Sequence, residues 1–216
     1  MFMVIICLFG VSLLLILSET LSHYKLVGPE LKRKIFHSGS GTFIAFWPWL
    51  LGWHAIAWIG LGMLAVTSIN GILPNKIFDF SRDIGRVTYG EGFLALAIII
   101  CALFTDHKII FALAILQVSL ADSAAAIIGQ QYGKPWHYKV FHQPKTIIGS
   151  MSFWFVSTCV LGFGLLFAHD FVSFNNYLLL VIALPPVLAV IENISPDGLD
   201  NLSVPLATVL VLNSLH

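Results

Sequence analysis

The stretch DSAAAIIGQQYGKPWHYKVFHQPKTIIGS, from Asp122 to Ser150, carries the strongest information about the fold. It begins with an acid inside an apolar segment, continues through small residues and glycines, and ends on a lysine before another apolar segment. A second stretch, ENISPDGLDN from Glu192 to Asn201, repeats this pattern near the end of a later apolar segment. A charge at the centre of a membrane span costs about 3 kcal/mol, so such charges usually mark a functional site.

The composition is that of a membrane protein. Of the 216 residues 58% are hydrophobic and 10% are charged, and the mean hydropathy is +0.90. This balance excludes an ordinary soluble domain, and the net charge of zero gives no overall field that would attract nucleic acid. The three cysteines lie in apolar runs and indicate neither a disulfide framework nor a metal site. We expect an all-α, polytopic membrane helix bundle in which residues 1–216 form a single domain.

Roughly eight apolar runs have about the length that one bilayer crossing needs. These runs are 1–18, 36–52, 54–73, 92–104, 108–128, 147–168, 177–193 and 203–215. The fourth and the last are short, so the sequence predicts seven or eight transmembrane helices. The first run has no basic residues before it, which favours a retained span over a cleaved signal peptide.

The basic residues predict the orientation of these spans. With eight spans, ten of the 11 Lys and Arg residues fall on one side of the membrane, and Lys108 falls on the other. The other basic residues are Lys25, Lys32, Arg33, Lys34, Lys76, Arg82, Arg86, Lys134, Lys139 and Lys145. Because basic loops stay in the cytoplasm, we expect the N-terminus outside and the polar stretches at a cytoplasmic-face active site. Seven spans would move the last acidic loop to the other side.

Asp122 is the first candidate for chemistry. Ala125, Ala126 and Gly129 follow it at helical spacing and form a stripe of small residues beside the carboxylate. Such a stripe lets another helix or a phosphate approach the backbone closely, and helix packing alone is the simpler explanation. Packing explains the alanines but not the acid, so we interpret Asp122 as functional.

Lys145, Thr146, Gly149 and Ser150 stand where a loop enters a helix. A lysine, two hydroxyls and the free N–H groups of a helix N-terminus suit a phosphate. The order of a Walker motif is absent. The alternative is a lysine at the membrane edge followed by a threonine that caps the helix.

The second polar stretch offers oxygen ligands. Glu192, Asp197 and Asp200 lie close together in sequence with Asn193 and Asn201. Carboxylates and amides are ligands for Mg²⁺, which usually takes one or two protein carboxylates in addition to substrate phosphates. A solvated turn with an Asx cap would explain Asp197, but it would not explain an acid that closes an apolar span.

The segment ELKRKIFHSGSG, from Glu30 to Gly41, adds Arg33, Lys34 and His37 at the start of the second span. Arg33 and His37 are four residues apart and share a helix face. A basic cluster that only sets topology would explain the lysines and the arginine, but not the histidine. Arg82, Arg86, Tyr89 and Glu91 are weaker candidates. Cations, hydroxyls and carboxylates on one membrane face suit phosphoryl transfer, which depends on positioning and charge neutralisation.

From about Glu30 onward the chain resembles the polyprenol kinase family, which includes dolichol kinase, phytol kinase and the CTP-dependent diacylglycerol kinase. The matching elements are R-K-x-x-H at Arg33 to His37, D-x-x-A-x-x-x-G-x-x-x-G at Asp122 to Gly133, K-[ST]-x-x-G-S at Lys145 to Ser150, and E…D-N-L-x-x-P at Glu192 to Pro205. One departure is Ala121, where family members often carry glycine. The short chain favours the compact, phytol-kinase-like branch.

The resemblance implies a kinase that transfers the γ-phosphate of CTP to a lipid alcohol with the help of Mg²⁺ or another divalent cation. Asp122, Lys145, Glu192 and Asp200 would be catalytic, and the three acids would hold the metal. The residues expected to bind nucleotide or phosphate are Arg33, Lys34, His37, Gly129, Gly133, Lys145, Thr146, Gly149, Ser150 and Asn201. The acceptor stays open among phytol, polyprenols, dolichol and diacylglycerol, and the sequence does not distinguish CTP from ATP.

Two other functions compete with this hypothesis. A phosphatidate cytidylyltransferase would also use CTP and a membrane lipid, but it would release pyrophosphate instead of CDP. A small ion-coupled transporter would use Asp122 and Glu192 as ion sites. Transporters tend to show inverted repeats and charges near the membrane midplane, whereas this chain has no clear repeat and gathers its charges at one face.

Overall fold

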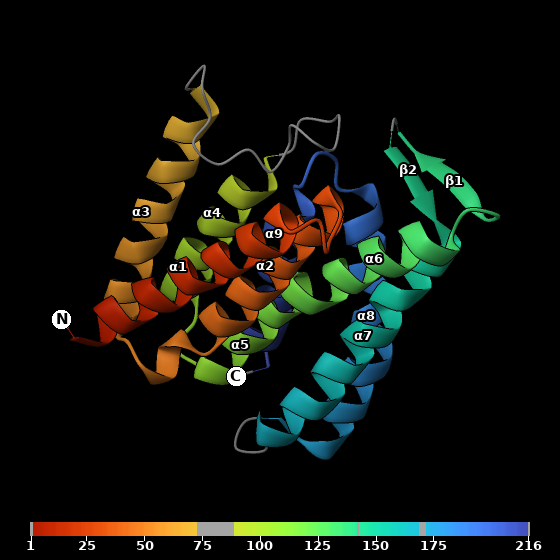
Figure 1. Cartoon of the computed structure of the whole chain (residues 1–216). Helices are drawn as coiled ribbons and strands as arrows, with labels where there is room; N and C mark the ends of the chain where they lie inside the picture. The colour runs from red at the N-terminus through yellow and green to blue at the C-terminus, as the bar shows by residue number, and fades with distance from the viewer. Residues whose placement is uncertain (1, 73–88, 142, 169–171, 216) are drawn as a thin grey trace.

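The predicted apolar runs are mostly helical in the computed structural model, which describes residues 2–72, 89–141, 143–168 and 172–215, but the run 36–52 is divided because its α-helix ends at residue 45. The helices in the first half are α1 (Phe2–His23), α2 (Pro29–Ala45), the short η1 (Trp47–Trp49), α3 (Trp53–Ile72) and α4 (Gly90–Phe104). Those in the second half are α5 (Lys108–Leu116), η2 (Gln117–Asp122), α6 (Ser123–Tyr132), α7 (Ile147–Leu165), the short η3 (Leu166–Ala168), α8 (Phe174–Ile194) and α9 (Asp200–Asn213). The predicted helical membrane bundle is therefore confirmed (Figure 1).

Five helical segments among the described residues are long and apolar enough to cross a membrane, and α4 is a shorter apolar helix. The five are Phe2–His23, Trp53–Gly71, Lys108–Tyr132, Ile147–Ala168 and Phe174–Ile194. Helices α2 and α9 have 17 and 14 residues, so they fall below the length of a full span. Both also carry polar motifs in their first turns. The orientation of the bundle stays a prediction.

The centre of the bundle is the continuous helix formed by α5, η2 and α6. Its middle part, η2, is a π-helix that ends at Asp122, and π-segments inside α-helices often occur at functional sites. Most of this segment is buried, and α2, α7 and α9 pack around it. A Cβ atom on Gly41 of α2 would overlap Ser119 Oγ, so the Ser119 side chain fits only because residue 41 is a glycine. Gly41, in the segment Ser38 to Gly41, therefore serves helix packing.

Helices α6 and α7 approach each other through glycines. A Cβ atom on Gly129 would lie 2.7 Å from Thr146 Oγ1 and 3.3 Å from the Gly149 Cα atom. A Cβ atom on Gly149 would lie 3.0 Å from the Ala125 carbonyl oxygen. The stripe of small residues beside Asp122 therefore packs against a second helix, which is the simpler of the two interpretations made from the sequence.

A two-stranded hairpin between α6 and α7 was not expected in an all-helical chain. Strand β1 (His137–Val140) pairs antiparallel with β2 (Gln143–Thr146), and Tyr138 faces Lys145 in the register. Figure 1 shows this hairpin at the same end of the bundle as the connection between α8 and α9. The hairpin thereby carries Lys145 toward the second polar stretch.

Candidate active site

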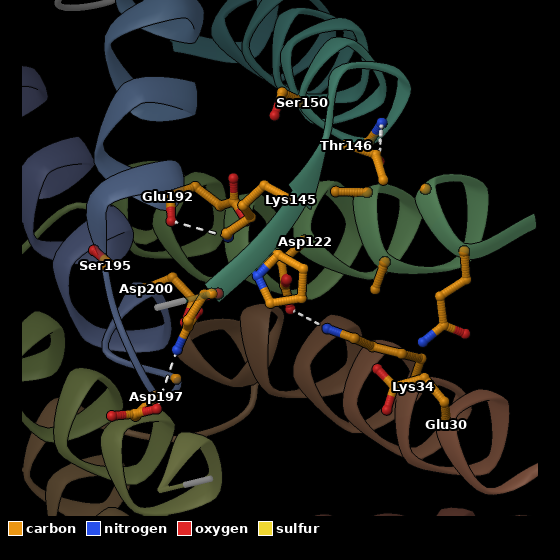
Figure 2. A pocket seen from close by; sticks show the side chains of 18 of the residues that line it. Glu30, Lys34, Asp122, Lys145, Thr146, Ser150, Glu192, Ser195, Asp197 and Asp200 are labelled. Carbon is orange, nitrogen blue, oxygen red and sulfur yellow. Dashed lines mark hydrogen bonds and ion pairs between the residues drawn. The ribbon is translucent and has the colours of Figure 1, made fainter. Parts of the chain in front are cut away.

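A cavity of about 480 Å³ opens at this end of the bundle (Figure 2). Its walls come from the start of α2, the junction of η2 and α6, the hairpin, the start of α7, the end of α8 and the start of α9. The predicted site residues that line it are Arg33, Lys34, Asp122, Gly129, Lys145, Thr146, Gly149, Ser150, Glu192, Asp200 and Asn201. Four sequence elements that are far apart in the chain thus share one cavity.

Three carboxylates meet in this cavity from three different helices. Asp122, Glu192 and Asp200 each offer one oxygen, and these oxygens all lie within 4.8 Å of one another. Asp122 and Glu192 are only 8% and 5% exposed, so their charges cannot be screened well by water. Acids this close repel one another unless a cation lies between them or one of them is protonated. The cluster is therefore a candidate metal site built by residues that the sequence analysis selected.

The donor set fits a hard cation such as Mg²⁺. All three groups are carboxylates, and Mg²⁺ prefers oxygen ligands. Asn201 also lines the cavity, and its buried Oδ1 atom has no hydrogen-bond partner among the described residues. An acceptor oxygen without a donor is costly to bury, and a bound cation or its water would satisfy it.

Two lysines already pair with members of the cluster. Lys34 on α2 donates to Asp122 Oδ2, and Lys145 on β2 donates to Glu192 Oε1. Lys145 Nζ also lies 3.3 Å from the Glu192 carbonyl oxygen. Burial favours the neutral amine, but the Glu192 carboxylate outweighs this effect and raises the pKa of Lys145 above its usual value. Lys145 therefore keeps its charge inside the cavity, where it contacts Glu192. Figure 2 shows this contact.

Arg33 is held by an acid that the sequence analysis did not select. Its Nη2 atom donates to Glu30 Oε1 at 2.6 Å, and both residues line the cavity from the first turns of α2. The available signal was the spacing, because an acid and an arginine three residues apart on a helix lie side by side. Glu30 thereby fixes the direction in which the guanidinium points.

His37 and Gly133 are the two predicted site residues that do not line the cavity. His37 is 1% exposed and lies behind Asp122, with its Nε2 atom 3.9 Å from Asp122 Oδ2 and its Nδ1 atom 4.0 Å from Glu91 Oε1. Gly133 packs against Thr146, whose Cβ atom would lie 2.6 Å from a Cβ atom on the glycine. The geometry thus favours an indirect role for both residues.

The start of α7 combines capping with a polar cluster. Thr146 Oγ1 accepts a hydrogen bond from the Gly149 N–H at 3.0 Å, which makes Thr146 the N-cap that the simpler interpretation expected. Ser150 Oγ lies 2.6 Å from Tyr138 Oη and 3.0 Å from Asn193 Oδ1. Tyr138 was not selected from the sequence, because a tyrosine in a short connection carries no pattern of its own.

The turn between α8 and α9 is tied to the hairpin. Asp197 and Gly198 have positive φ angles of 52° and 91°, and the turn they make brings Asp200 back beside Glu192. Gln143 Nε2 donates to Asp197 Oδ1 at 3.1 Å, so Asp197 also connects this turn to the hairpin. Of the weaker candidates, Arg82 and Arg86 lie outside the described residues.

Comparison with known proteins identifies the family of this chain. No family model matches the sequence, and no solved structure matches it. The chain is similar to a phytol kinase from Synechocystis sp. (strain ATCC 27184 / PCC 6803 / Kazusa), with 33% identity over 203 residues. The matched region covers 90% of this chain and 83% of that protein. This chain therefore belongs to the polyprenol kinase family, the membrane enzymes that phosphorylate lipid alcohols.

Proposed function

We propose that this protein transfers the γ-phosphate of CTP to the hydroxyl group of an isoprenoid alcohol of the phytol type. The observation that carries the proposal is the meeting of Asp122, Glu192 and Asp200 with Lys34 and Lys145 in one cavity. Phosphoryl transfer needs cations for the phosphate oxygens and acids that hold a divalent metal. The cavity offers both within one set of side chains.

The acceptor is argued from the relative. The similar protein from Synechocystis is named a phytol kinase, and the similarity runs over most of both chains. An isoprenoid alcohol is therefore a better acceptor candidate than diacylglycerol. CTP is proposed as the donor from the family resemblance, since the sequence does not distinguish CTP from ATP.

In the proposed mechanism, Asp122, Glu192 and Asp200 would hold Mg²⁺ or another divalent cation. When bound, that cation would neutralise charge on the phosphate oxygens. Arg33, held by Glu30, would direct its guanidinium at the nucleotide phosphates, and Lys34 and Lys145 would add two point charges. The oxygen of the alcohol would form a bond to the γ-phosphorus as the bond to CDP breaks.

The proton of the alcohol needs an acceptor in the same step. A carboxylate of the cluster would orient the hydroxyl and take its proton as the new bond forms. Asp122 is a candidate for this role, because Lys34 from α2 and the ring of His37 hold it in place from one side. The proposed orientation puts the cavity in the cytoplasm, where nucleotides are available.

The test is phosphate transfer by the purified protein in lipid nanodiscs. CTP and ATP labelled at the γ-phosphate are each offered with phytol, a longer polyprenol and diacylglycerol. The proposal predicts a labelled lipid phosphate from CTP and phytol, with CDP as the second product and loss of transfer when EDTA removes divalent cations. Pyrophosphate release with phosphatidate would instead assign a cytidylyltransferase, and faster transfer from ATP would overturn the choice of donor.

A further inference from the structure

We infer that the lipid alcohol reaches the cavity along an apolar groove between α7 and α8, where Tyr138 and Ser150, both held by Asn193, position its hydroxyl group. The inference rests on the proposed function and adds the place where the acceptor binds. The groove has a volume of about 320 Å³ and lies beside the active-site cavity. It differs from that cavity because no charged side chain lines it.

The groove is built from two helices that are apolar enough to span the membrane. Its α7 wall consists of Ile147, Met151 and Trp154, which follow one another at the spacing of one helix face. These side chains are 46%, 56% and 48% exposed, so in a membrane they face the lipid. Opposite them, α8 contributes only Pro186 and Ala189. Large side chains on one wall and small ones on the other leave room for a hydrocarbon chain.

The groove and the cavity share Ser150, which lines both. Ser150 is the polar member of the α7 face that carries Ile147 and Trp154. Its hydroxyl, Tyr138 Oη and Asn193 Oδ1 contact one another, and Asn193 directly follows the metal-site candidate Glu192. A polar cluster at the end of an apolar groove suits a molecule with one hydroxyl group and a hydrocarbon tail.

The hairpin joins this cluster to the catalytic groups. Tyr138 and Lys145 are directly opposite each other on β1 and β2, and opposed residues point to the same face of a sheet. Tyr138 reaches Asn193 while Lys145 reaches Glu192, so the two strands contact two successive residues of α8. An alcohol held by the polar cluster would lie beside the carboxylates that the reaction needs.

We expect the groove to select its lipid ligand by shape more than by polarity. Lipid tails are as apolar as the groove, so a chain that moves from the bilayer into it gains packing contacts but no hydrophobic free energy. The lipid-facing side is open, which lets the far part of a long tail extend into the bilayer. We therefore expect selection of the chain segment next to the hydroxyl and tolerance of tail length.

Photolabelling tests the groove without requiring catalysis. The whole protein in nanodiscs, without nucleotide, is irradiated with a prenol that carries a diazirine close to its hydroxyl group, and labelled residues are identified by mass spectrometry. The inference predicts labels on Met151, Trp154 and Ala189, reduced about fivefold by excess phytol and by the groove-filling change Ala189→Leu. Phe155 and Phe163 are exposed on α7 but do not line the groove. Labelling of these two residues as strong as that of the groove residues would overturn the inference. Labelling that excess phytol does not reduce would also overturn the inference.

Kinetics then separate this inference from the proposed function. Trp154→Ala and Ala189→Leu should raise the KM for phytol about fivefold and leave the KM for the nucleotide unchanged, while the control Phe155→Ala should change neither. If the wild type phosphorylates phytol and both groove variants have the same KM for phytol as the wild type, the proposed groove is not the acceptor site and the proposed function stands. If the wild type phosphorylates no alcohol while phytol still competes for the labelled groove, the proposed function fails and the groove stands.

Discussion

Lys145 on β2 donates a hydrogen bond to Glu192 at the end of α8, and this contact joins two sequence elements that lie 47 residues apart. Both side chains are largely buried, at 18% and 6% exposure. A buried pair of this kind positions its members well, and either member alone would be a costly buried charge. The contact explains why a hairpin interrupts the helical bundle: it brings a cation to the carboxylate cluster.

Loss of one partner of this pair should destabilise the protein more than loss of both charges. We expect Lys145→Met to lower the free energy of unfolding by about 3 kcal/mol, because Glu192 then stays buried without its partner. The double change Lys145→Met with Glu192→Gln should recover most of the stability but no activity. Thermal unfolding in detergent, followed by tryptophan fluorescence, measures the first effect. A double variant that is less stable than Lys145→Met would contradict this account.

The importance of Lys145 for turnover has a matched control in the same hairpin. Lys139 on β1 is exposed and does not line the cavity. Lys145→Ala should reduce kcat by about a hundredfold, since it removes a cation from the site of phosphoryl transfer. Lys139→Ala should leave kcat unchanged. Equal losses in both variants would mean that the hairpin acts through its fold and that Lys145 has no special part.

Asp200 should set the requirement for a divalent cation. Asp200→Asn keeps the size of the side chain but removes one charge from the cluster, so it should raise the Mg²⁺ concentration for half-maximal activity about tenfold. A Mg²⁺ titration of the phosphate-transfer rate measures this shift. An unchanged titration curve with a lower maximal rate would remove Asp200 from the metal site.

The close contact between α6 and α7 predicts that an alanine is destabilising at Gly149 in α7 but tolerated at Gly62 in α3. A Cβ atom on Gly149 would lie 2.8 Å from Thr146 Oγ1 and 3.0 Å from the Ala125 carbonyl oxygen, so Gly149→Ala should destabilise the protein by about 2 kcal/mol. Gly62, inside α3, has no atom within 4 Å of such a Cβ position. Gly62→Ala should be neutral or stabilising by up to about 1 kcal/mol. Thermal unfolding of both variants checks the pair, and similar melting temperatures would contradict the packing.

The proposed orientation can be tested with two single cysteines in a background without the native three. Lys139, on the hairpin, and Asp106, in the connection between α4 and α5, are both exposed, so the two variants are Lys139→Cys and Asp106→Cys. A membrane-impermeant maleimide applied to intact cells should label the second and leave the first unlabelled until the cells are opened. The reverse pattern would place the active site outside.

Much of the bundle and the site followed from the sequence because both depend on local patterns. Apolar runs predict helices, and an acid such as Asp122 inside one of them is informative because it is costly there. The sequence could not predict how Glu192 and Asp200 meet Asp122, since that depends on helix packing. The hairpin was missed because its four-residue strands are too short to show alternation, and Tyr138 was missed with it. Glu30 had one signal in the sequence, its three-residue spacing to Arg33, and an acid in a first helical turn is also favoured by the helix dipole.

The central claim is that the carboxylate cluster performs phosphate transfer, and Asp122 tests it most directly. The measurement is transfer from γ-labelled CTP to phytol by the wild type, Asp122→Asn and the exposed-acid control Asp106→Asn, all in nanodiscs with Mg²⁺. The account predicts transfer by the wild type and the control, and a loss of about a thousandfold or more in Asp122→Asn at unchanged helical content. Transfer by Asp122→Asn at the rate of the control would show that the reaction takes place elsewhere.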